Sequence, residues 1–274
     1  MGQTQAHPSD HAGGLPAFLD LPGRPAKPRA TGRTHVLDTG LPIPVMRAIL
    51  DANDDVIDLW KFGFGTAYLD ATVAHKVTLL ADHGVTACIG GTLLEVSWLQ
   101  DQVGDCLAWA AGIGFGCIEV SNGSTPMSIE DKRALIKRAA ADFTVVSEVG
   151  SKDADTPVDA AAWRDEMLGD LEAGATLTLA EGRASGTVGL YRPDGSVRER
   201  LVKMLTDDVG DRVVFEAPRA AQQAWFVRRL GPAVNLANVD ATAVLAVETL
   251  RLGLRADTID LGDTAPPPHD SWQR

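Results

Sequence analysis

The sequence predicts an α/β fold, a single closed (β/α)8 TIM barrel, on three observations. Eight short apolar runs alternate with eight amphipathic segments between about residues 33 and 260, with no change of composition between them. Five of the apolar runs end on an acidic residue that a turn former follows closely. The length of 274 residues also suits one barrel of roughly 250 residues plus tails.

The predicted strands are short runs rich in β-branched residues, each bounded by glycine, proline or another turn former. In chain order they cover residues 35–38, 56–62, 85–89, 117–120, 144–148, 176–180, 212–215 and 233–236. Five of these strands have an acidic residue at their carboxyl end or directly beside it. These residues are Asp38, Glu119, Glu148, Glu181 and Glu216. The same placement on five strands predicts that these carboxylates gather at one end of the barrel, where active sites are built.

A helical segment follows each strand. The predicted helices cover residues 42–50, 71–83, 99–111, a stretch that begins after Ser128, then 158–173, 197–205, 220–230 and 242–252. Pro42 suits the first turn of a helix, and Ser128 can cap a helix N-terminus. A doubly wound open sheet is the alternative fold. It is disfavoured because the nearest approach to a dinucleotide-binding glycine motif, Gly63-Phe-Gly65, lacks the third glycine.

Both ends of the chain read as tails. Residues 1–32 are rich in proline, glycine and polar residues, and we expect a flexible N-terminal tail without the apolar core of a signal peptide. Residues 33–260 form the catalytic barrel. Residues 261–274, with three consecutive prolines, form a C-terminal tail.

Composition narrows the choice of partners and compartment. A formal net charge of -12 disfavours nucleic acid and anionic membrane surfaces. No apolar run approaches the roughly 20 residues of a membrane span. The three cysteines lack metal-ligand spacing and predict inert thiols in a reducing compartment. We therefore expect a cytoplasmic protein that binds neither nucleic acid nor membranes, with a homo-oligomer compatible with the sequence. If its substrates are small anions, the cationic groups must be concentrated in the site.

The strand ends predict one mouth that is rich in charged groups. Its expected members are Asp38, Lys61, Thr92, Glu119, Glu148, Glu181, Glu216 and Asn235, with Lys152, Arg183 and Asn238 in adjoining loops. Several carboxylates without histidine are typical ligands of a hard cation, most plausibly Mg²⁺. We assign the metal to Asp38, Glu119, Glu181 and Glu216. The alternative is that these acids only form ion pairs with Lys61, Lys152 or Arg183.

Two glycine-containing stretches can bind an anion. Residues 181–186 combine glycine backbone with Arg183, Ser185 and Gly186, and residues 90–92 offer the N–H groups of Gly91 and Thr92. We add Asn235, Asn238 and Arg255 to the predicted substrate and phosphate contacts. Lys152, Lys61 and Glu148 are the predicted catalytic residues, since a lysine in a barrel mouth can bind an anion or donate a proton.

The strand ends and the last helix carry a series of short motifs between about residues 33 and 259. They are 36–42 (VLDTGLP), 61–66 (KFGFGT), 90–95 (GGTLLE), 118–124 (IEVSNGS), 147–152 (SEVGSK), 181–186 (EGRASG), 215–218 (FEAP) with Gln222 and Gln223, 234–238 (VNLAN) and 248–258 (ETLRLGLRADT). In these motifs and in their order the chain resembles a known family, phosphosulfolactate synthase, which adds sulfite to phosphoenolpyruvate in coenzyme M biosynthesis. The resemblance implies an eight-stranded α/β barrel, Mg²⁺ as cofactor, and Lys152 as the matching catalytic lysine.

The chain departs from the family pattern at five positions. Asn122 stands where the family usually has aspartate, Ser151 where it has lysine, Ala184 where it has glutamate and Leu252 where it has arginine. Phe64 replaces a loop tryptophan. Acidic and cationic positions are thus lost together, which indicates a retuned site rather than an inactive one and questions sulfite as second substrate.

The resemblance implies a magnesium-assisted addition of sulfite to phosphoenolpyruvate, giving (2R)-phospho-3-sulfolactate. Two alternatives remain. One is a related barrel enzyme that adds another nucleophile to an enolpyruvyl-type acceptor. The other is a stress-associated relative without catalysis, against which the set of strand-end acids and Lys152 argues.

Overall fold

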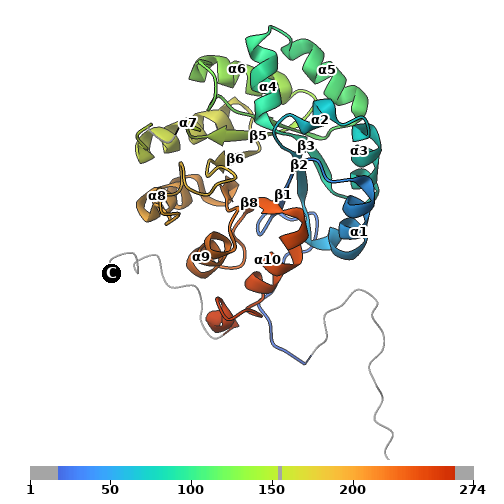
Figure 1. Ribbon diagram of the computed structural model, residues 1–274. Coiled ribbons are helices and arrows are strands. Elements are labelled where there is room, and N and C mark those ends of the chain that lie inside the picture. Colours follow the sequence, from blue (N-terminus) through green and yellow to red (C-terminus); the bar gives the residue numbers. More distant parts are fainter. Residues whose placement is uncertain (1–17, 154–155, 263–274) are drawn as a thin grey trace, which may run out of the picture.

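The computed structural model describes residues 18–262 apart from residues 154 and 155. Its centre is a closed barrel in which eight strands follow one another in chain order, every neighbouring pair being parallel (Figure 1). The strands are β1 (Thr34–Asp38), β2 (Leu59–Phe62), β3 (Thr86–Ile89), β4 (Cys117–Val120), β5 (Thr144–Val149), β6 (Leu177–Ala180), β7 (Val213–Glu216) and β8 (Leu236–Asp240). The predicted fold is confirmed.

Helices surround the barrel and connect each strand to the next (Figure 1). They are α1 (Ile43–Asn53), α2 (Thr66–Leu69), α3 (Val73–Asp82), α4 (Gly91–Leu99), α5 (Val103–Ile113), α6 (Ile129–Ala139), α7 (Ala160–Ala173), α8 (Glu199–Val209), α9 (Ala220–Leu230) and α10 (Val244–Arg251). Ser128 caps α6 as predicted, because its hydroxyl accepts the Asp131 N–H at 3.0 Å. The segment between β3 and β4 holds two helices, α4 and α5, where one was predicted.

Strand alternation sorts the side chains into two layers. The inward positions fill the barrel with a small apolar cluster, formed by Leu59, Cys88, Cys117, Val146, Leu177, Leu179, Val214 and Ala237. The outward positions, such as Val36, Trp60 and Phe62, pack under the helices in the larger core. We call the carboxyl end of the strands the mouth and the amino end the floor. In the last residues of each strand, the inward face opens into the mouth.

The N-terminal segment differs from the prediction. Residues 18–32 are attached to the floor instead of forming part of a free tail. The Arg24 guanidinium pairs with Glu248 at 2.6 Å, and Arg29 pairs with Asp58 at 3.0 Å. Gly32 N–H donates to the Ala233 carbonyl. These partners lie far away in sequence, so composition alone gave no sign of them. Residues 1–17 and 263–274 lie outside the described residues.

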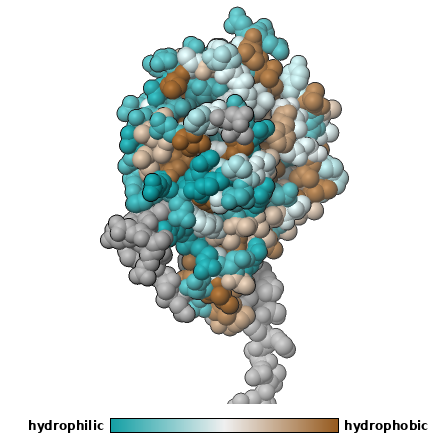
Figure 2. Space-filling view, turned by 60° about the vertical axis from the view of Figure 1, so that its left-hand side comes forward, coloured by the Kyte–Doolittle hydropathy of each residue, from teal (hydrophilic) through white to brown (hydrophobic). Residues whose placement is uncertain are grey.

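The outer surface of the described chain is mixed. Figure 2 shows hydrophobic residues scattered among hydrophilic ones on the face turned toward the viewer. Within residues 18–262, apart from the two undescribed positions, no helix has the length and apolar character needed to cross a membrane.

Candidate active site

Four glutamates line a cavity of about 540 Å³ at the mouth of the barrel. Glu119 ends the inward face of β4, and Glu148 does the same on β5. Glu181 directly follows β6, and Glu216 closes β7. All four are buried. The prediction that strand-end carboxylates converge is therefore confirmed for these four residues.

Asp38 was wrongly placed in this set. It lies on the outward face of β1, beside Phe62 in the strand register, whereas its neighbour Leu37 faces the mouth beside Lys61. The Asp38 carboxylate accepts hydrogen bonds from Trp60 Nε1 at 3.0 Å and from the Gly40 and Leu41 N–H groups. Lys76 of α3 lies 3.8 Å away. Asp38 thus fastens the β1–α1 turn to the helix layer and is not among the residues that line the mouth cavity.

Lys61 stands inside the mouth as predicted. Its ammonium lies 2.8 Å from Glu119 and 3.4 Å from Glu216. Burial alone would lower the pKa of Lys61, but Glu119, Glu216 and Glu148 outweigh it and hold that pKa well above its usual range. Burial raises the pKa of Glu119, although Lys61 partly opposes this. Its neighbours thus favour the protonated form of Lys61, which lies between Glu119 of β4 and Glu216 of β7.

Three of the glutamates are arranged as a candidate cation site. One carboxylate oxygen from each of Glu148, Glu181 and Glu216 lies within 4.8 Å of the others. Within the described residues, the buried Glu181 Oε2 has no hydrogen-bond partner, and Glu148 Oε1 has the ammonium of Lys152 at 3.2 Å. Burial raises the pKa of Glu181 well above its usual range, and repulsion by Glu148 and Glu216 raises it further. An all-oxygen set with unused lone pairs suits Mg²⁺. Glu148, predicted as catalytic, thus replaces Asp38 in the candidate metal set.

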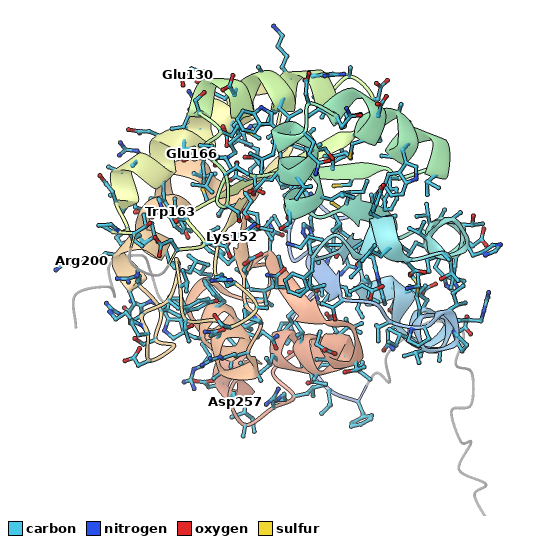
Figure 3. All side chains as sticks on the ribbon, turned by 45° about the horizontal axis from the view of Figure 1, so that its top comes forward. Glu130, Lys152, Trp163, Glu166, Arg200 and Asp257 are labelled. Atoms are coloured by element: carbon cyan, nitrogen blue, oxygen red, sulfur yellow. The ribbon has the colours of Figure 1, made fainter. Side chains whose placement is uncertain are left out.

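Lys152 reaches the mouth from the β5–α7 loop. Its ammonium lies 3.2 Å from Glu148 and 3.6 Å from Glu95. Burial lowers the pKa of Lys152, but Glu148, Glu181 and Glu95 outweigh that and raise it. In turn, burial would raise the pKa of Glu148, whereas Lys152 and Lys61 hold it below its usual value. In Figure 3, Lys152 lies near the middle of the ring of elements.

Both predicted anion-binding stretches border the cavity. Gly91 and Thr92 line it at the start of α4, and Gly91 N–H donates to Glu119 at 2.9 Å. A side chain on Gly91 would collide with Ser121. Arg183 and Ser185 line the opposite wall. Gly186 lies in the same loop, but its carbonyl is held by the Gln222 amide at 2.8 Å.

Asn238 enters the mouth through a β-bulge. Thr34 pairs with Leu236 and Val36 with Val239, so β8 carries one residue more than β1 over this stretch. Asn238 has a φ of 55°, and its buried Oδ1 has no hydrogen-bond partner. Bulges next to active sites commonly redirect a side chain. The side chain lines the mouth cavity as predicted.

Asn235 and Arg255 do not reach the mouth. The eighth strand begins at Leu236, later than predicted, so Asn235 lies at the floor. There its amide donates to the carbonyls of Asp211 and Val213. Arg255 follows α10, which returns to the floor, and pairs with Asp257 at 3.0 Å. Figure 3 places Asp257 at the outer edge, away from Lys152. Both predicted substrate contacts are therefore wrong.

The sequence pattern of the family (2R)-phospho-3-sulfolactate synthase (ComA) matches residues 22–257. The chain is also 39% identical over 247 residues to the phosphosulfolactate synthase of Bacillus subtilis (strain 168), which covers 89% of this chain and 98% of the relative. The chain belongs to the phosphosulfolactate synthase family. The same enzyme of Methanothermobacter thermautotrophicus is 39% identical over 253 residues, 87% of this chain and 95% of the relative.

Solved structures agree on the fold alone. Thiamine phosphate pyrophosphorylase from Pyrococcus furiosus matches with a TM-score of 0.52 at 13% identity, covering 81% of this chain and 95% of that one.

The phosphosulfolactate synthase family pattern begins at residue 22, which agrees with the attachment of residues 18–32 to the floor.

Most departures from the phosphosulfolactate synthase pattern lie away from the cavity wall. The Asn122 amide donates to the Met127 carbonyl, and Ser151 bonds within its own loop. Leu252 is buried at the end of α10. Only Ala184 and Phe64, among the five positions, line the mouth cavity. Of the four departures that change charge, only the one at Ala184 alters the wall of the mouth cavity.

Sequence reasoning missed two polar contributors to this site. Ser124 lines the mouth cavity, and Glu95 lies buried behind it. Both belong to stretches that match the family, 118–124 and 90–95. Glu95 was overlooked because the predicted helix began at residue 99, which left residues 90–95 without an assigned face.

Proposed function

We propose that this protein catalyses the addition of sulfite to phosphoenolpyruvate, giving (2R)-phospho-3-sulfolactate, with Mg²⁺ as cofactor. The observation that carries the proposal is one cavity that combines three cationic side chains, Lys61, Lys152 and Arg183, with a group of converging buried carboxylates. Family membership supports the same reaction. A cation bound by the carboxylates would reduce the negative charge of the site. The cationic side chains could then bind an anionic acceptor.

Glu148, Glu181 and Glu216 would hold the cation, because one oxygen from each converges on the same point and Glu181 Oε2 has no hydrogen-bond partner among the described residues. When bound, Mg²⁺ supplies a Lewis acid that stabilises negative charge developing on the carboxylate of the acceptor. Glu119 is the poorer candidate, since it does not belong to this convergent group and both its oxygens accept hydrogen bonds, from Lys61 and from the Gly91 N–H.

The residues of the chain would orient the acceptor. Arg183 uses one guanidinium nitrogen on the Lys152 carbonyl at 2.9 Å, which leaves other donors for phosphate. The N-terminus of α4 at Gly91 and Thr92 supplies partial positive charge on the opposite wall. The Asn238 amide faces the cavity from β8. Together with Lys61, these groups offset the repulsion between two anionic reactants.

Lys152 would serve as the proton donor. The sulfite sulfur forms the new bond to the methylene carbon, and the electron pair of the carbon–carbon double bond moves toward the acceptor carboxylate. The adjacent carbon then takes a proton from Lys152 Nζ. A raised pKa keeps Lys152 protonated before the reaction, and delivery becomes favourable as negative charge grows beside it.

The direct test incubates the protein with phosphoenolpyruvate and sulfite, with and without Mg²⁺, and follows the sulfonated product by mass spectrometry. We expect product with the metal and little after chelation. Absence of product under both conditions would refute the proposed reaction.

Ala184 favours a second candidate, the addition of another nucleophile to the same acceptor. It lines the cavity where the family usually has glutamate, so the wall offers more room and one charge less. A panel of small thiols in place of sulfite separates the two. Faster turnover with a thiol than with sulfite would select the second candidate.

A further inference from the structure

Glu95 is a buried carboxylate that the proposed chemistry does not use. It lies on α4, one turn after the helix begins, with 1% of its surface exposed. Its neighbours on this helix are mainly apolar or small. Burying a carboxylate is costly unless charged or hydrogen-bonding partners compensate for the lost water. The partners of Glu95 therefore indicate why it is there.

Those partners come from the next two strand–helix units. The Ser121 hydroxyl donates to Glu95 Oε1, and the Ser124 N–H donates to Oε2 at 3.0 Å. Both serines belong to the segment between β4 and α6. The ammonium of Lys152, in the β5–α7 loop, lies 3.6 Å from Oε1. One side chain thus connects three consecutive units of the barrel at the mouth.

The two loops that Glu95 joins also touch each other. The Lys152 N–H donates to the Gly123 carbonyl at 3.3 Å. A Cβ on Gly123 would approach the Gly150 carbonyl oxygen to 2.7 Å, so only glycine permits this approach of the loops. The backbone of Lys152 is therefore fixed against the loop whose Ser124 amide is held by Glu95.

Lys152 lies between two acids with different surroundings. Glu148 lines the mouth cavity together with Lys152, whereas Glu95 is not among the residues that line it. Glu148 also belongs to the candidate cation site. Glu95 therefore remains a partner of the ammonium from behind the wall when Glu148 is engaged in the cavity.

We infer that Glu95 is a positioning residue, which holds Lys152 over the mouth cavity from behind and ties the β4–α6 and β5–α7 loops together. It acts through Lys152 and does not contact the reactants. The kinetic part of this inference rests on the proposed function, while the part concerning the loops does not.

Two substitutions separate these parts. Glu95→Gln keeps the length of the side chain and an acceptor for the Ser124 N–H but removes the charge that faces Lys152. Glu95→Ala removes every contact. Glu248→Gln is the matched control, because Glu248 is also buried and ion-paired, with Arg24, but at the floor.

The first measurement needs no substrate. Hydrogen exchange followed by mass spectrometry compares peptides covering 121–124 and 149–153 with peptides from the floor. In Glu95→Ala we expect exchange at the mouth peptides to rise on the order of tenfold, with the floor unchanged. A uniform rise over the chain, or no rise at the mouth, would overturn the role in tying the loops.

The second measurement is steady-state kinetics with phosphoenolpyruvate, sulfite and Mg²⁺. For Glu95→Gln we expect kcat to fall on the order of 10- to 100-fold with KM for phosphoenolpyruvate within about twofold, because a displaced donor impairs the chemical step more than binding. Glu248→Gln should keep both constants. An unchanged kcat in Glu95→Gln would overturn the positioning of Lys152. If the wild type forms no product, the proposed function fails, and the exchange result still decides the structural part.

Discussion

The two ends of the barrel treat buried charge in opposite ways. At the floor, cations meet backbone carbonyls and single acids: Arg251 donates to the carbonyls of Pro232 and Val234 at 2.6 Å, and Arg24 pairs with Glu248. At the mouth, Glu148, Glu181 and Glu216 face one another, and Glu181 Oε2 has no hydrogen-bond partner among the described residues. A buried ion pair is costly to break, whereas a group of buried like charges is typical of a site that a ligand completes.

The largest expected effect on function is at the mouth. Lys152→Ala should lower kcat on the order of 10²- to 10⁴-fold, because it removes the proposed general acid. The protein should still fold, with a modest fall in melting temperature, because the partly exposed lysine is the cationic partner of the buried Glu148 and Glu95. Mass spectrometry of the product measures the fall in kcat, and thermal unfolding measures the melting temperature. The exposed Lys137→Ala is the control, and near-normal turnover in Lys152→Ala would remove the role given to Lys152.

The corresponding change at the floor should affect stability and spare catalysis. Arg251→Met leaves the Pro232 and Val234 carbonyls without their donor in a buried setting, which should cost about 3–5 kcal/mol of unfolding free energy. Urea unfolding measures this cost. KM and kcat of the folded protein should not change. The surface variant Arg228→Met should lose little stability; an equally small loss in Arg251→Met would contradict the contrast between the two ends.

Much of the architecture was predictable because its signals are local. Apolar runs bounded by turn formers located the first seven strands and the start of the eighth, and the strand-end acids located the mouth. Whether a strand-end side chain points into the barrel or toward the helices could not be read from the neighbouring residues in the sequence. Asp38 closes its run as Glu119 does, yet it faces the helices, because the register pairs it with Phe62.

Errors elsewhere arose from geometry that spans several strands. Asn238 enters the mouth only through a bulge created by the pairing of β8 with β1. Asn235 falls at the floor because β8 begins at Leu236, three residues later than predicted. Arg255 could have been excluded from topology alone, since a residue that follows a barrel helix lies at the amino end of the strands.

A buried histidine at the floor, His35, should make the stability of the protein depend on pH. Burial, with Arg33 and Lys61 adding to it, lowers the pKa of His35 from 6.5 to about 3. The unfolded chain therefore binds the proton more readily between these values, and the stability from neutral His35 is lost as pH falls below 6.5. Between pH 7 and 5 this loss is about 2 kcal/mol.

Urea unfolding at both pH values measures that loss in the wild type and in His35→Gln. The variant should lose less stability on acidification, because its side chain does not titrate. The exposed His75→Gln should follow the wild type. If the wild type and His35→Gln lose the same unfolding free energy between pH 7 and pH 5, the pH dependence of stability does not come from His35.

The smallest expected effect is a gain of stability, whereas most mutations lower the stability of a protein. Glu181→Gln removes one of three facing carboxylates, so the protein without metal should gain on the order of 1 kcal/mol of stability from relieved repulsion. The same change removes a charged oxygen ligand, and the affinity for Mg²⁺ should fall at least about tenfold. Thermal unfolding without metal and titration calorimetry with Mg²⁺ measure the two effects, with the exposed Glu172→Gln as control. A loss of stability with unchanged Mg²⁺ affinity would mean that the acids of the mouth are paired for structure, as the charges of the floor are.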